Sequence, residues 1–310
     1  MSEFAPLDSK GGAAPATRPG RGSLSQSVVI GSLDRVTSPK YGFGTFYILK
    51  HMKADVMDPN IYAKASSELL ATALGVGWII TGIFRPDVIE SNPLKDRIGY
   101  NNVCVGWDME PASYVSSFFV SFSAYCSLRF AFTSIIKYDL MLEKGLMKGA
   151  RHFFATASLY YYGFTIACVP IILVCQPTTN VWLHSLFFLN VILSRAFITI
   201  FAFLTSRGSL DSLANKLYLV VYTFVSFMIP ILVFYTFILY DSVGSRAPDS
   251  GFLPVWVIKY MDITWFVCLA TTAKFLPNDF VVKRDFELVM ALAEGEDEKD
   301  ASSTSHRKCM

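Results

Sequence analysis

Residues 181–205 read VWLHSLFFLNVILSRAFITIFAFLT, and the only ionisable side chains in this stretch are His184 and Arg195. A helix needs about 20 mostly apolar residues to cross the hydrocarbon core of a bilayer, which is about 30 Å thick. Several other segments of the chain have the same length and character. The sequence therefore predicts an all-α polytopic membrane protein, a bundle of six transmembrane helices. The predicted spans are 66–84, 114–136, 153–175, 181–205, 217–240 and 252–276.

The composition of the whole chain supports this class. The 310 residues are 53% hydrophobic and 17% charged, whereas soluble domains average about 45–50% apolar and about 25% charged. The net charge of +2 and the lack of a basic stripe among aromatic residues argue against a nucleic-acid partner. The histidines are scattered and the cysteines lack zinc-finger spacing, so neither a metal nor a cofactor is expected. No catalytic motif appears, which leaves open whether the protein is an enzyme.

The chain divides into four regions. Residues 1–42 are rich in Gly, Pro, Ser and charged residues, contain no apolar signal segment, and are expected to form a disordered tail. Residues 43–65 are amphipathic and suit an interfacial segment that lies along the membrane surface. Residues 66–280 form the six-helix transmembrane domain. Residues 281–310 form a second polar tail.

The distribution of Lys and Arg between the loops predicts the orientation, because cytoplasmic loops are enriched in both. The amino-terminal region, the loops at 137–151 and 206–216, and the carboxy-terminal tail are basic. The loop at 176–180 has no Lys or Arg, the loop at 241–251 has only Arg246, and the first loop is richer in acids than in bases. Both termini are therefore expected in the cytoplasm, with the first, third and fifth loops on the lumenal or extracellular side.

Ionisable groups inside the spans are the candidate functional residues, because lipid rejects them unless they face protein or water. Arg129 and Arg195 are expected at about the same depth, Asp262 in the lumenal half of the last span, and His184 at the lumenal start of the fourth. One interpretation is that these groups satisfy one another, with Asp262 paired to Lys259 or an arginine and the arginines snorkelling. The other is a polar cavity in which the two arginines face an anionic headgroup or a carbonyl.

Three further residues belong to this lumenal half or to the same depth. Tyr161, within the triplet of tyrosines at 160–162, reaches the level of the arginines and is a candidate headgroup contact; the alternative is interfacial anchoring or core packing. Cys104 in the first loop and Cys175 at the end of the third span are candidates for a disulfide, because both would face an oxidising lumen.

The pattern of isolated residues in this layout resembles the family of post-GPI-attachment-to-proteins factor 2, which also holds the damage-regulated autophagy modulators. Members are six-pass proteins with a long first lumenal loop. The resemblance spans roughly residues 66–280. The matching positions are Cys104 in NNVCVGWDMEP, Pro111, the step Leu128-Arg129-Phe130, His184 in WLHSLFF, Asp262 and the pair Asp279-Phe280.

The resemblance implies a Golgi or endoplasmic-reticulum membrane factor that remodels the acyl chains of GPI anchors, with a membrane lipid or GPI-anchor lipid as its partner. In this hypothesis Arg129 and Arg195 hold the phosphate, while His184 and Asp262 position or activate an acyl group. The terminal RKCM resembles a dibasic retrieval signal of early compartments. The alternatives are a non-enzymatic endolysosomal modulator that binds other membrane proteins, and a small-solute transporter.

Overall fold

The computed structural model of the protein describes residues 56–206, 208–243, 255–277, 280–283 and 288–290. Six helical segments in this part are long and apolar enough to cross a membrane. The predicted fold class, an α-helical polytopic membrane protein, is confirmed. The two predicted tails lie almost entirely outside the described residues, as does most of the predicted interfacial segment. The spans are α2 (Pro59–Phe84), α5 (Ala112–Glu143), α6 (Gly149–Ala167) continued by α7 (Val169–Val174), α8 (Pro177–Thr205), α9 (Leu213–Val243) and α10 (Val255–Phe275).

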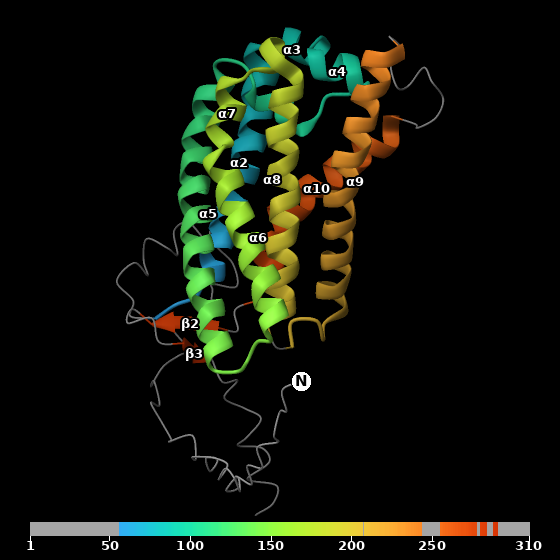
Figure 1. The fold of residues 1–310 in the computed structure, drawn as a ribbon. Helices are drawn as coiled ribbons and strands as arrows, with labels where there is room; N and C mark the ends of the chain where they lie inside the picture. The colour runs from blue at the N-terminus through green and yellow to red at the C-terminus, as the bar shows by residue number, and fades with distance from the viewer. Residues whose placement is uncertain (1–55, 207, 244–254, 278–279, 284–287, 291–310) are drawn as a thin grey trace, which may run out of the picture. The chain divides into compact units, whose positions relative to one another are not determined.

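The long helices pack in a closed ring (Figure 1). Each packs against the next one in the chain, and α10 returns to pack against α2. Large side chains fill the interior, among them Trp265, Phe203 and Ile192. Large apolar side chains also cover the outer face, including Phe118 and Phe164. A helix that is apolar on both its inner and outer face is the type that lipid solvates.

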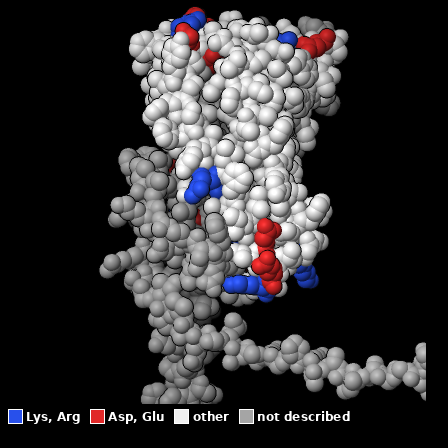
Figure 2. Space-filling view, turned by 60° about the vertical axis from the view of Figure 1, so that its left-hand side comes forward, with Lys and Arg blue, Asp and Glu red and all other residues white. Residues whose placement is uncertain are grey.

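The surface of the described part has a broad uncharged band (Figure 2). On the face shown, Lys, Arg, Asp and Glu gather towards the two ends, with one basic group between them. This distribution is the one expected for a protein whose middle section lies in the hydrocarbon core of a bilayer.

The helix ends follow local sequence signals. Asp58 caps α2 by accepting a hydrogen bond from the Asn60 backbone N–H at 2.9 Å, and Pro59 occupies the first turn, where its missing N–H has no consequence. This helix therefore begins before residue 66, the predicted start of the first span, and the added residues are buried in the bundle. The third span is interrupted between α6 and α7 next to Pro170, which cannot donate the backbone hydrogen bond that a continuous helix needs.

Short elements lie at the two ends of the bundle (Figure 1). The loop between α2 and α5 forms α3 (Pro86–Glu90), α4 (Pro93–Ile98) and the 3₁₀ helix η2 (Val103–Trp107). At the opposite end, β1 (Val56–Met57), β2 (Phe280–Lys283) and β3 (Leu288–Met290) form an antiparallel sheet in the order β1-β2-β3. Val56 pairs with Lys283, and Val281 pairs with Val289. The all-α prediction did not include this small sheet. We call the two ends the η2 end and the sheet end.

Candidate functional site

The 3₁₀ helix η2 is held in place by side chains from two transmembrane helices. Its Val103 carbonyl accepts a hydrogen bond from Trp78 Nε1 at 2.8 Å, and its Gly106 carbonyl accepts one from Thr81 Oγ1 at 2.7 Å. Asp262 Oδ2 of α10 accepts the Val103 backbone N–H at 2.9 Å. Because so short a helix leaves most of its backbone groups unpaired, these bonds fix η2 against α2 and α10.

Two glycines allow η2 to lie against the backbone of α2. A Cβ atom on Gly106 would lie 2.7 Å from the Trp78 backbone nitrogen, and a Cβ atom on Gly77 would lie 2.8 Å from the Gly106 carbonyl oxygen. Both separations are shorter than a carbon atom tolerates. Glycine at both positions is thus required for the contact between η2 and α2.

His184 enters the site from the first turn of the regular part of α8. Asn180 has extended backbone angles, and its Oδ1 accepts the Leu183 N–H at 3.0 Å, so Asn180 acts as the cap of this helix. His184 Nδ1 lies 3.2 Å from the Ile172 carbonyl and 3.0 Å from the Cys175 carbonyl. Since a carbonyl oxygen can only accept, Nδ1 carries a proton, and in the neutral form of the ring Nε2 presents a lone pair.

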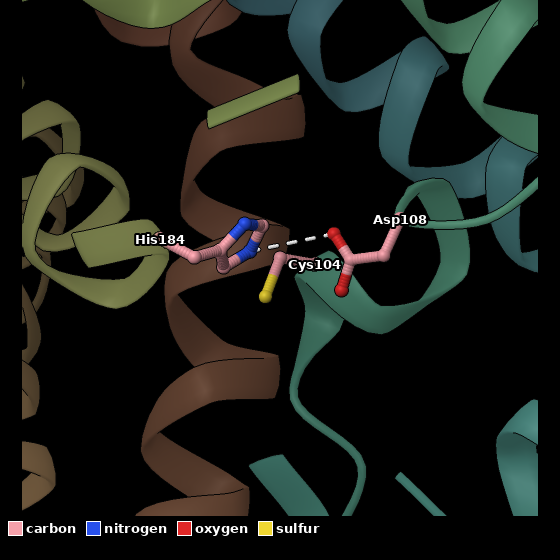
Figure 3. A group of neighbouring side chains, drawn as sticks. All are labelled: Cys104, Asp108 and His184. Atoms are coloured by element: carbon pink, nitrogen blue, oxygen red, sulfur yellow. Dashed lines mark ion pairs between the residues drawn. The ribbon is translucent and has the colours of Figure 1, made fainter. Parts of the chain in front are cut away.

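That lone pair faces a carboxylate and a thiol (Figure 3). His184 Nε2 is 3.3 Å from Asp108 Oδ1, and one donor atom each of Cys104, Asp108 and His184 lies within 4.8 Å of the others. The three residues are 2%, 8% and 1% exposed, respectively. Asp108 Oδ1 and His184 Nε2 have no hydrogen-bond partner. If neither atom carries a proton, two acceptors face each other in a buried position, and a shared proton or a bound cation would satisfy both.

The electrostatic surroundings of this group are acidic. Asp262 contributes a second buried carboxyl group, whose Oδ1 has no hydrogen-bond partner. Within the described part of the chain, neither Asp108 nor Asp262 forms an ion pair with a Lys or Arg, so the pairing of Asp262 with Lys259 that the sequence allowed is not formed. Burial raises the pKa of the Asp108 carboxyl well above its usual range. We call Cys104, Asp108, His184 and Asp262 the acidic site.

The thiol of Cys104 belongs to the acidic site rather than to a disulfide. Cys104 and Cys175 are both free in the structure, although both lie close to His184: Cys104 Sγ faces its ring and Cys175 offers its backbone carbonyl. Burial, and then the nearby Asp108 and Asp262 carboxyl groups, raise the pKa of the Cys104 thiol well above its usual range. A pairing of the two cysteines would remove this thiol from the group around His184.

Arg195 lies in a second polar group deeper in the bundle. Its Nη1 donates to Ser67 Oγ at 2.9 Å and its Nη2 donates to Ser66 Oγ. Ser66 Oγ is also 2.6 Å from Ser127 Oγ, which accepts the Tyr162 hydroxyl at 2.7 Å. Ser66, Ser67, Ser123, Ser127, Tyr162 and Arg195 make up what we call the hydroxyl cluster. It is the polar centre around an arginine that the sequence allowed, with Tyr162 as its tyrosine.

Two other sequence candidates lie apart from this cluster. Arg129 is exposed on the outer face of α5, with its guanidinium 5.7 Å from the centre of the Tyr62 ring. Tyr161 donates its hydroxyl to Asn190 Oδ1 at 2.6 Å. The two arginines therefore do not face one common cavity.

A small, mostly apolar pocket lies next to the hydroxyl cluster, two of whose residues, Ser123 and Arg195, line it. Trp107, which precedes Asp108, lines one part of it, and Arg195 lines another. Phe188, one turn after His184, and Ile172, whose carbonyl accepts from His184, complete the side near the acidic site. The pocket thus lies between Arg195 and residues that adjoin the acidic site, whose own four side chains do not line it.

Sequence reasoning named His184, Asp262, Arg195 and Cys104 but missed Asp108, which it counted only as one of several acids in the first loop. The serines of the hydroxyl cluster were also missed. The four-residue spacing of Cys104 and Asp108, around the glycine at Gly106, is the signal that could have drawn attention to this loop.

Comparisons of the chain with protein-family models, with curated proteins and with solved structures found no match.

Proposed function

We propose that this multi-pass membrane protein remodels the acyl chains of a membrane lipid, with the lipid of GPI anchors as its substrate. The observation that carries the proposal is the contact of His184 Nε2 with Asp108 Oδ1 at 3.3 Å, in a buried position beside an apolar pocket. A histidine next to a carboxylate can take up and return a proton, which is the task that transfer or hydrolysis of an acyl ester requires.

The location of the acidic site supports the proposal. The loop charges predict both termini in the cytoplasm, and in that orientation the η2 end lies on the lumenal side. The acidic site would then lie near the lumenal surface of the membrane, for which we propose the Golgi or the endoplasmic reticulum. A lipid could reach this depth with its ester groups and leave its chains in the bilayer.

In this proposal the residues of the two polar groups have different roles. His184 and Asp108 exchange the proton, and Asp262 holds η2 through the Val103 N–H. Arg195, which lines the pocket, offers a positive charge towards a carbonyl or phosphate oxygen. Arg129, on the outer face of α5, is available to a headgroup that has not entered the bundle.

The proposal can be tested by rescue of cells that lack their GPI-lipid remodelling factor. Cells that express this chain should regain a GPI-anchored reporter at the surface, measured by flow cytometry, and remodelled anchor lipids, measured by mass spectrometry. His184→Gln and Asp108→Asn should each lower the remodelled fraction at least about tenfold. Ser121→Ala, an exposed position on α5, is the matched control and should rescue fully.

The opposite result has a clear meaning. Absence of rescue by protein that is expressed and reaches the Golgi or endoplasmic reticulum would contradict the remodelling function. Capture of membrane-protein partners from endolysosomal membranes would then test the non-enzymatic modulator.

A further inference from the structure

The structure assigns Cys104, Asp108 and His184 to a binding site for a single divalent transition-metal ion, with Zn²⁺ as the first candidate. The inference depends on the geometry of these three side chains and not on the identity of the lipid substrate. It assigns His184 Nε2 and Asp108 Oδ1 to the ion, so in the metal-bound protein a water at the ion's open position would exchange the proton that the proposed function gives to these two residues.

The donor atoms are already close to the arrangement that zinc requires. Zinc binds Cys sulfur at about 2.3 Å, His nitrogen at about 2.0–2.1 Å and Asp oxygen at about 2.0–2.2 Å in a tetrahedron, which places the ligand atoms roughly 3.3–3.7 Å from one another. His184 Nε2 and Asp108 Oδ1 are 3.3 Å apart, and all three donors lie within 4.8 Å. Small side-chain rotations of Cys104 would bring the set together around one ion.

The unpartnered atoms point to a missing cation. Asp108 Oδ1 and His184 Nε2 are buried acceptors without a hydrogen-bond partner, and they face each other. A buried polar group without a partner is costly, and a cation between two acceptors satisfies both. No Lys or Arg of the described residues pairs with Asp108, so none of these side chains supplies such a cation.

The hydrogen bonds of His184 resemble those that usually orient a metal-binding histidine. A metal-binding histidine usually donates its other ring N–H to a carbonyl or carboxylate, which fixes the tautomer and the ring orientation. His184 Nδ1 has the carbonyls of Ile172 and Cys175 at 3.2 and 3.0 Å. These carbonyls lie at the end of α7, where a helix leaves its last carbonyl groups unpaired.

The charge of the three ligands and the types of their donor atoms indicate which metal ion the site would bind. A thiolate, a carboxylate and a neutral imidazole together carry a charge of about −2, and a coordinated thiol loses its proton to the metal site. A divalent ion would make the buried group neutral. Sulfur and nitrogen donors favour zinc and its neighbours over Mg²⁺ or Ca²⁺, which prefer oxygen. Three protein ligands leave a fourth position for water or a substrate oxygen.

The test is the metal content of the full-length protein, purified in detergent with a tag that contains no histidine and without chelators. Mass spectrometry of the elements should find about one zinc per chain. Cys104→Ser, Asp108→Asn and His184→Gln should each lower zinc affinity about tenfold or more. Cys126→Ser, a buried cysteine on α5, and Cys309→Ser in the tail are the matched controls and should keep the metal.

Cobalt substitution gives a second readout that does not need a stable variant. Protein loaded with Co²⁺ should show thiolate-to-cobalt charge-transfer absorption, and Cys104→Ser should lose it. Wild-type protein that holds no stoichiometric metal after zinc-supplemented expression, and that gains no thermal stability when zinc is added, would overturn the site. Metal that persists in all three variants would do the same. A proton shared by Asp108 and His184 would then explain their contact. Because these measurements do not involve lipid, their failure is distinguishable from failure of the remodelling function.

Discussion

The hydroxyl cluster holds a cation, Arg195, among neutral oxygen atoms, whereas the acidic site holds Asp108 and Asp262 with no Lys or Arg paired to either in the described part of the chain. In the hydroxyl cluster each serine oxygen bonded to Arg195 has its hydrogen bond. In the acidic site Asp108 Oδ1, Asp262 Oδ1 and His184 Nε2 have none. The first group is satisfied except at Arg195 Nε, which has no hydrogen-bond partner, and the second is complete only with a proton or a cation added.

The hydroxyl cluster therefore has mainly a structural role in the bundle, whereas the acidic site is the candidate for chemistry. A buried guanidinium that donates to hydroxyl groups ties helices together, because a hydrogen bond to a charged group contributes about 1.5–3 kcal/mol. Arg195 on α8 thereby joins α2, and through Ser66 and Ser127 it joins α5. Small serine side chains also let transmembrane helices approach closely. In the acidic site Asp262 also has a structural role, because its Oδ2 holds η2 against α10, but the unpartnered atoms of the site remain available to a ligand.

The largest effect is expected from a substitution that disrupts the acidic site but leaves all of its ionisable side chains unchanged. Gly106→Ala places a Cβ atom 2.7 Å from the Trp78 backbone nitrogen, so η2 must move away from α2. We expect a loss of about 3 kcal/mol in the free energy of unfolding, measured by titration with SDS in detergent micelles, together with loss of the site's ligand.

The matched control for this substitution is Gly163→Ala on α6, where an added Cβ atom meets nothing within 4 Å. It should leave stability unchanged or raise it by up to about 1 kcal/mol, because alanine favours the helix. Equal stabilities for the Gly106→Ala and wild-type proteins would mean that η2 is not held against α2 in the way described.

The next effect concerns the hydroxyl cluster. Ser66→Ala removes an oxygen that contacts Ser123, Ser127 and Arg195, and it leaves part of the buried guanidinium without a partner. The expected loss is about 1–3 kcal/mol in the same SDS titration, with no change at the acidic site. Ser121→Ala is the control: it is exposed and bonds only within its own helix, so the change should stay within about 0.5 kcal/mol. A Ser66→Ala protein as stable as this control would show that the cluster does not brace the bundle.

The contrast between the two groups also explains what the sequence could predict. Hydropathy predicted all six spans, and the predicted start of the fourth span at Val181 follows directly after the cap at Asn180. The predicted start of the first span is too late. Residues 59–65 include Asn60 and Lys64, whose polar side chains are unusual in a transmembrane helix but are buried here by packing. The Asp-Pro step at 58–59 is the local signal that marks the true start.

The acidic site was only half visible in the sequence. His184 and Asp262 attracted attention because they are ionisable and lie in apolar spans. Asp108 lies in a loop where acids are common, and its role depends on η2, a short helix held by tertiary contacts from Trp78 and Thr81. No periodicity in the sequence encodes that fold of the loop. Hydroxyl groups on spans likewise give no signal, because serine is compatible with either face of a transmembrane helix.

A smaller effect tests whether Asp262 positions η2 or takes part in chemistry. Asp262→Asn keeps an oxygen for the Val103 N–H but removes the carboxylate, so stability should change by less than about 1 kcal/mol. Asp262→Leu leaves that N–H unpaired and should lose about 1–3 kcal/mol. Thermal unfolding and the reporter rescue are to be measured on both proteins.

The two readouts separate the roles of Asp262. Full rescue by the Asn variant would make Asp262 a positioning residue only. Loss of rescue at unchanged stability would show that its carboxylate acts in the reaction, as the sequence-based hypothesis has it. Equal loss of stability in both variants would contradict the hydrogen bond to Val103 as the source of its structural role.

The smallest effect on stability is expected at Arg129, the basic residue that lies outside both polar groups. Arg129→Ala removes a cation–π contact with Tyr62. The guanidinium is exposed on α5, and at an exposed site such a contact contributes only about 0.5–1 kcal/mol to stability. If Arg129 holds the phosphate of the lipid, the variant should insert normally and remodel anchor lipids more slowly, and Arg129→Lys, which keeps the charge, should recover part of the rate. An Arg129→Ala protein that remodels at the full rate would exclude this role. Phosphate recognition would then fall to Arg195, whose side chain lines the small apolar pocket inside the bundle.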